Sequence, residues 1–158
     1  MARGRYNYTK ALGVLVDFAY AQGFTTVDLN HTESSMSWEP KSLNFPKSIK
    51  VEGSYNKEIQ VYLFLHELGH FELRRDWDKF GYILPMVYEA ETTKFMYGDK
   101  NLMKRNLYIV SAIEEEYKAW EEGYKLADKL GIKINEDNWN WIRTKCLMSY
   151  IRHYGRKK

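Results

Sequence analysis

Two histidines and a glutamate stand at a spacing that suits metal chemistry. His66 and His70 are four residues apart in the run His-Glu-Leu-Gly-His, and Glu67 directly follows the first histidine. On an α-helix, residues four apart lie one turn above each other on the same face, so both imidazoles can bind one Zn²⁺ ion. Glu67 is offset around the helix and can accept a proton from a water molecule held by that ion. The pattern therefore predicts a zinc site with His66 and His70 as ligands and Glu67 as the general base.

The surroundings of this motif favour the metal site over a structural interpretation. Only four histidines occur among the 158 residues, and two of them belong to the motif. The motif lies inside a helical pattern that follows a predicted strand. Gly69, between the two histidines, would let another backbone or a substrate approach closely. The alternative interpretation is that both histidines pack on an ordinary structural helix.

A catalytic zinc ion usually has three protein ligands, so a further ligand must come from elsewhere in the chain. Three consecutive glutamates lie on a predicted helix over residues 107–130, beside a stripe of apolar side chains. At about 100° per residue, Glu116 lies nearest this stripe, Glu114 lies to its side and Glu115 lies almost opposite. We therefore predict Glu116 as the third metal ligand. The alternatives are Glu89, Glu91, Glu114 and Glu115.

The remaining pattern predicts the elements that position these residues. Apolar periodicity and capping residues indicate helices over 9–22, 56–75, about 85–97, 107–130 and 135–154. Strands are expected over 24–29 and 45–52, with a loop over 30–44. Pro46 suggests that the second strand lies at an edge of the sheet or begins late. The prediction is one domain over 1–158, with a compact α+β fold in which a small edge-stranded sheet packs on the metal-binding helix.

The segment from Ile49 through His70 resembles the strand, helix and His-Glu-Leu-Gly-His of small bacterial and phage-encoded zinc peptidases, including the ImmA/IrrE-like group. In that group a glutamate on a later helix, often followed by alanine three residues on, is the third ligand, and Glu116 and Ala119 match this pattern. The resemblance covers roughly residues 45–130. It implies a minimal zincin fold of the gluzincin type and hydrolysis of a peptide bond in a protein substrate. It also implies that the substrate pairs with an edge strand, which the sequence places at 45–52.

The composition of the chain indicates which kinds of partner the protein binds and in which cellular compartment it works. The formal net charge of +3 is too small to indicate a nucleic-acid partner, and no apolar run is long enough to cross a membrane. The single cysteine, Cys146, favours a reducing compartment, and we expect a cytoplasmic protein. Two alternatives to a peptidase of peptide or protein substrates remain: a non-catalytic interaction or structural protein with a zincin fold, and a DNA-associated protease of the SprT-like kind. A peptidase also needs a donor for the oxyanion of its intermediate, and the pattern does not select one among thirteen tyrosines.

Overall fold

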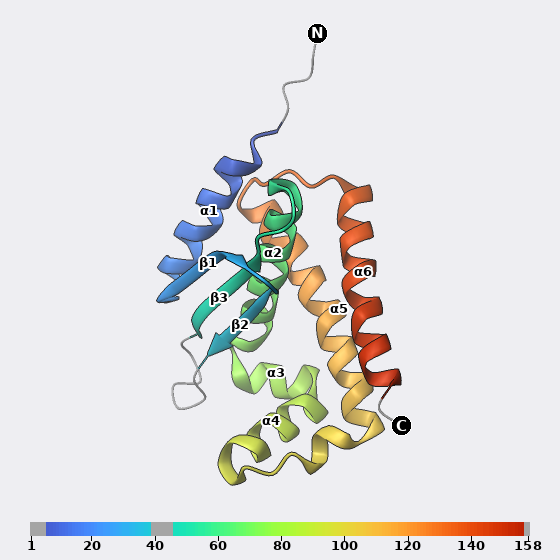
Figure 1. Ribbon diagram of the computed structural model, residues 1–158. Coiled ribbons are helices and arrows are strands. Elements are labelled where there is room, and N and C mark those ends of the chain that lie inside the picture. The colour runs from blue at the N-terminus through green and yellow to red at the C-terminus, as the bar shows by residue number, and fades with distance from the viewer. Residues whose placement is uncertain (1–5, 39–45, 157–158) are drawn as a thin grey trace.

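The computed structural model describes residues 6–38 and 46–156, and within them it is an α+β fold, as predicted. A small sheet and helix α1 lie on one side of the central helix α2, and helices α5 and α6 lie on the other side (Figure 1). The elements in chain order are α1 (Tyr8–Ala21), β1 (Thr26–His31), β2 (Ser35–Trp38), β3 (Pro46–Glu52), α2 (Lys57–Arg74), α3 (Trp77–Ile83), α4 (Pro85–Tyr97), the 3-10 helix η2 (Asn101–Lys104), α5 (Asn106–Lys129) and α6 (Glu136–Gly155).

The helix ends follow local capping chemistry. The side chains of Asn7, Asn56 and Asn135 accept hydrogen bonds from backbone N–H groups in the first turns of α1, α2 and α6. Gly98 ends α4 in the left-handed conformation, with φ of 67°. The five predicted helices are therefore confirmed. Helix α3 was not predicted, although Asp76 caps it by accepting a hydrogen bond from the backbone N–H of Lys79.

The sheet differs from the prediction in the position of its strands. Its order is β1-β3-β2, and β3 pairs in parallel with β1 and antiparallel with β2. The prediction that residues 45–52 form an edge strand is therefore wrong, with Phe45 itself outside the described residues. Pro46 is the first residue of β3, where its missing N–H costs the ladder little. Strand β2 lies within the predicted loop, because the alternation of polar and apolar residues in Ser-Met-Ser-Trp is too short to stand out from the serine-rich segment around it.

Helices α2 and α5 approach each other unusually closely. A side chain at Gly69 of α2 would overlap the backbone carbonyl of Ala119 on α5. A side chain at Gly123 of α5 would lie 2.5 Å from the carbonyl oxygen of Leu65 on α2. The expectation that Gly69 permits a close backbone approach is thus confirmed. The partner backbone is the helix that carries the three consecutive glutamates.

This close approach decides which face of α5 is buried. Its buried residues are Glu115, Ala119, Trp120, Gly123, Leu126 and Ala127. Val110 and Tyr117, two members of the predicted apolar stripe, are 65% and 43% exposed. The prediction that Glu115 lies opposite the core is wrong, because Glu115 is only 4% exposed. Small residues set the contact between the two backbones, so the buried face is centred on Ala119 and Gly123 and includes Glu115.

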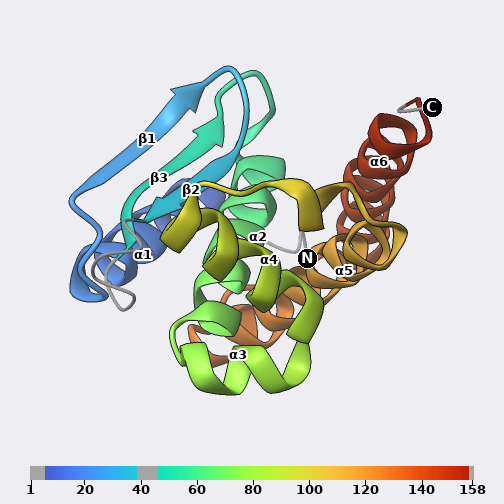
Figure 2. The ribbon, with the colours of Figure 1, turned by 90° about the horizontal axis from the view of Figure 1, so that it is seen from below.

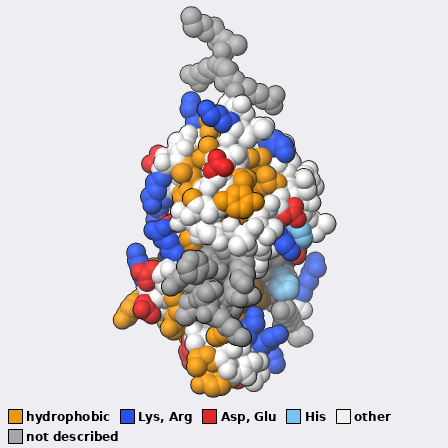
Figure 3. Space-filling model, turned by 90° about the vertical axis from the view of Figure 1, so that its left-hand side faces the viewer, with side chains coloured by type: hydrophobic (Ala, Val, Ile, Leu, Met, Phe, Trp, Pro, Cys, Tyr) orange, Lys and Arg blue, Asp and Glu red, His pale blue; other side chains and the backbone are white. Residues whose placement is uncertain are grey.

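Helices α3 and α4 form a separate layer at one end of α2 and α5, as the view from below shows (Figure 2). Their apolar side chains make a second small core around Phe80, Leu84 and Val87. On the face shown in Figure 3, lysine and arginine side chains are interspersed with acidic ones. Across residues 6–38 and 46–156, no helix combines the length and the apolar character needed to cross a membrane.

Candidate metal centre

His66 and His70 of α2 meet Glu116 of α5 at one point. The Nε2 atoms of His66 and His70 lie 3.2 and 3.3 Å from Oε2 of Glu116. One ligand atom from each of the three residues lies within 4.8 Å of the others. The structure thus brings together the three residues that the sequence predicted as metal ligands, from helices that are packed backbone to backbone.

The donor set and its spacing fit a zinc ion. Two imidazole nitrogens and one carboxylate oxygen are ordinary zinc ligands, with bonds of about 2.0–2.2 Å. Ligands of a tetrahedral ion at such distances are separated by about 3.3 Å. The two Nε2–Oε2 distances, 3.2 and 3.3 Å, match that separation. All three side chains are mostly shielded from solvent, which strengthens their electrostatic attraction for a cation.

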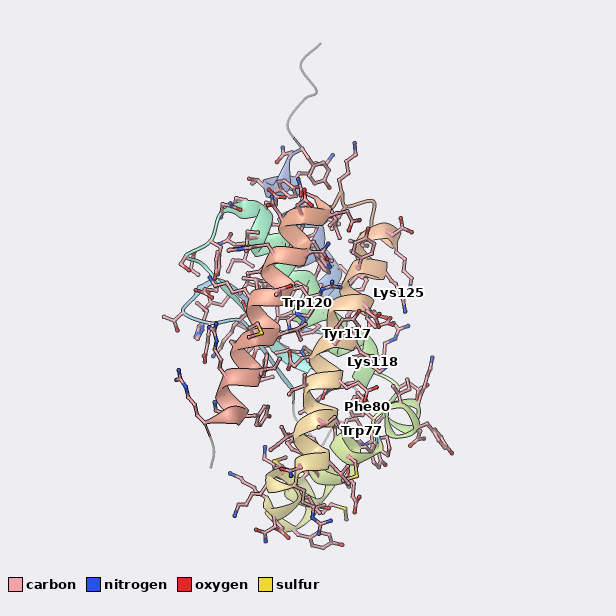
Figure 4. The ribbon with its side chains drawn as sticks, turned by 90° about the vertical axis from the view of Figure 1, so that its right-hand side faces the viewer. Trp77, Phe80, Tyr117, Lys118, Trp120 and Lys125 are labelled. Carbon is pink, nitrogen blue, oxygen red and sulfur yellow. The ribbon has the colours of Figure 1, made fainter. Side chains whose placement is uncertain are left out.

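The His66 ring is held by stacking. It lies parallel to the Trp120 indole, with ring centroids 4.4 Å apart and planes inclined by 19°. Trp120 is fully buried and also packs edge-on against Trp139 of α6. In Figure 4 Trp120 lies between α5 and α6. Among the described residues, Nδ1 of His66 has no hydrogen-bond partner, so packing fixes the orientation of this ring. Burial lowers the pKa of His66 and keeps a lone pair available for a metal ion.

His70 lies between two adjacent glutamates. Its Nδ1 is 3.2 Å from Oε1 of Glu115, and its Nε2 faces Glu116. Burial lowers the pKa of His70, but Glu116 and Glu115 outweigh it and raise the pKa to about 10. Burial opposes ionisation of Glu116, but His70 and His66 hold its pKa well below the usual range. The carboxylate is therefore ionised, as a metal ligand must be.

Glu67 is buried beside this cluster and 6% exposed. Burial raises its pKa to about 8; His70 acts against this increase, and the negative charge of Glu116 adds to it. A carboxylate with a raised pKa is a stronger base, which suits proton abstraction from water near neutral pH. A divalent cation held by the three neighbouring ligands would favour its ionised form.

Tyr150 of α6 is a functional candidate that sequence reasoning missed. Burial raises the pKa of its hydroxyl, and the negative charges of Glu116 and Glu67 raise it further. The only sequence signal was its position one turn after Cys146, on the face of α6 that carries Ile142. Tyr117, which the chain places next to Glu116, instead lies half exposed beneath Arg143.

The other candidate ligands lie outside the cluster. Glu89 is exposed on α4, and Glu91 lies 3.9 Å from Arg74. Glu114 is exposed and pairs with Lys118 at 3.6 Å. Glu115 contacts His70 through the nitrogen that faces away from Glu116, and it is not itself in the three-residue cluster.

Comparison with known proteins gives no match: no protein-family model fits the chain, and neither the curated proteins nor the solved structures include a similar one. The geometry of the His66–His70–Glu116 cluster is therefore the evidence for a function. The resemblance to small zinc peptidases stays a prediction.

Proposed function

We propose that this protein is a zinc-dependent peptidase in which His66, His70 and Glu116 hold the metal ion. The observation that carries the proposal is the convergence of these three side chains beside the buried carboxylate of Glu67. The sequence alone predicts a role for each of these four residues. Their chemistry corresponds to a three-ligand site with one position open for water or substrate.

In this proposal the residues divide the work of peptide hydrolysis. A bound zinc ion would supply Lewis acidity, polarising the scissile carbonyl and making water more acidic. Glu67 would take the proton from the attacking water and pass it to the departing amine. Tyr150 would donate its hydroxyl hydrogen to the carbonyl oxygen as negative charge develops there.

The edge of the sheet offers a place for the substrate. Strand β2 pairs with β3 on one side, and it contacts α2. Among the described residues, no strand pairs with its other side. An extended peptide could add to β2 through backbone hydrogen bonds, which would leave recognition to its side chains. We therefore propose β2, and not the strand predicted over 45–52, as the strand with which a substrate pairs. The substrate class would be an extended segment of a protein.

Tyr150→Phe removes the proposed donor and keeps the ring. We expect kcat/KM for a cleaved peptide to fall about 100-fold, the usual effect of removing one donor to an oxyanion. Zinc content should not change, because the hydroxyl is not a ligand. Tyr82→Phe, at a position 89% exposed on α3, is the control. Unchanged kinetics in Tyr150→Phe would remove Tyr150 from the mechanism.

The proposal is tested by incubating the zinc-loaded protein with a diverse mixture of unstructured peptides and identifying new termini by mass spectrometry. We expect a reproducible set of cleavages that a chelator abolishes and added zinc restores. Cleavage that persists in chelator would contradict the proposal.

The single cysteine, Cys146, packs partly buried against the core, and we place the activity in the reducing cytoplasm.

A further inference from the structure

The two nitrogens of His70 face two consecutive residues of α5. Nε2 faces Glu116 in the candidate metal cluster, and Nδ1 lies 3.2 Å from Oε1 of Glu115. If Nε2 binds a metal ion, the ring proton must be on Nδ1, where Glu115 can accept it. A carboxylate in this position fixes both the tautomer and the orientation of a ligating imidazole.

Glu115 is itself held by Arg74, which lies one helical turn after His70 on α2. Arg74 donates from Nε to Oε1 of Glu115 at 2.6 Å and from a terminal nitrogen to Oε2 at 2.8 Å. This two-point contact fixes the plane of the carboxylate as well as its position. It also balances the charge of Glu115, so that Glu116 alone contributes negative charge among the metal ligands.

The segment between the histidine motif and α5 encloses this pair. The Arg74 guanidinium lies over the Phe80 ring of α3, 5.2 Å from its centroid, and Glu91 of α4 is 3.9 Å away. Phe80 is fully buried in the small α3–α4 core, which also packs against Leu73 and Tyr108. Figure 4 shows Phe80 and Trp77 on α3 at the level of the N-terminal half of α5. Helices α3 and α4 thus keep the Arg74–Glu115 pair away from water.

We propose that Glu115, clamped by Arg74 under helices α3 and α4, is a positioning residue that presents Nε2 of His70 to the metal ion. The inference rests on the proposed metal site, but it does not depend on which substrate is cleaved. In this proposal α3 and α4 shield the Arg74–Glu115 pair from water, although neither helix supplies a ligand.

The test removes both charges together. A single substitution would leave one buried charge unpaired and could unfold the protein, whereas Arg74→Met with Glu115→Leu replaces the pair by apolar side chains. We expect the zinc dissociation constant, measured by competition with a chromophoric chelator, to rise about 10- to 100-fold. The melting temperature of the metal-free protein should change little. The matched control is Glu114→Leu with Lys118→Met, which removes an exposed ion pair from the same helix.

A second readout reports on the ring itself. Long-range ¹H–¹⁵N spectra of the zinc-loaded wild type should show His70 protonated on Nδ1 alone, with slow exchange of that proton. In the paired variant we expect faster exchange and a broadened His70 signal. Equal zinc affinity in the paired variant and the wild type would overturn the positioning role and leave the peptidase proposal intact. Tight, Glu115-dependent zinc binding without any peptide cleavage would support the positioning role and contradict the peptidase proposal.

Discussion

Glu67→Gln is expected to abolish peptide cleavage and to leave the zinc content unchanged. The amide has nearly the same shape as the carboxylate but cannot accept a proton from water at neutral pH. Loss of a general base reduces the rate by about 10²- to 10⁴-fold, so kcat should fall by that factor while zinc remains stoichiometric. The buried position also favours a neutral side chain, because burial already raises the pKa of Glu67 to about 8. Rates are measured on a peptide identified in the cleavage screen.

The control for this variant is Glu72→Gln, the same chemical change on the same helix. Glu72 pairs with Arg75 at 3.4 Å and lies outside the metal cluster. Its substitution should leave both activity and zinc content as in the wild type. If Glu67→Gln cleaved peptides as fast as wild type, Glu67 would not be the base, and a non-catalytic role for its carboxylate would be favoured.

Gly69→Ala should cause the largest loss of stability of any small substitution near the site. The added methyl would overlap the Ala119 carbonyl, which belongs to the backbone of a buried helix and cannot rotate away. Overpacking of this kind costs about 1–3 kcal/mol or more, and we expect the upper end. Because α5 must move to make room, Glu116 should also separate from the two imidazoles. The measurement is denaturant unfolding, together with zinc affinity.

Gly13 provides the matched control for this glycine. It lies exposed within α1, and a side chain there would meet no atom within 4 Å. Gly13→Ala should therefore stabilise the protein by about 0.5–1 kcal/mol, since alanine has the higher helix propensity. A Gly69→Ala protein as stable as the wild type, with unchanged zinc affinity, would show that the close packing of α2 on α5 does not position the ligands.

Most of the helical framework could be predicted because its signals are local. Asn56 and Asn135 cap their helices through side-chain hydrogen bonds within the same turn, and Gly98 ends α4 by its own backbone conformation. The sheet could not be predicted in this way. Strand β2 is held by pairing with β3, a contact between separate segments that the four residues Ser-Met-Ser-Trp are too few to signal.

In the candidate site, too, local patterns could be predicted and contacts between separate helices could not. His66 and His70 could be selected from their spacing, because helix geometry alone puts them on one face. The prediction that Glu116 turns inward is confirmed, although the assumed buried face of α5 was centred on the wrong residues. Glu115 was placed wrongly because the contact with α2 is set by small residues such as Ala119. Nothing in the sequence indicated that Arg74 belongs to the site, because its partner Glu115 lies on a helix that is far away along the chain.

The most direct test of the metal site is the zinc content of the purified protein after reconstitution and dialysis. The account predicts about one zinc ion per chain for the wild type, as in a mononuclear site. It predicts the same content for Glu114→Ala and nearly none for His70→Ala or Glu116→Ala. A wild type that retains no zinc, or a His70→Ala protein that binds zinc as tightly as the wild type, would contradict it.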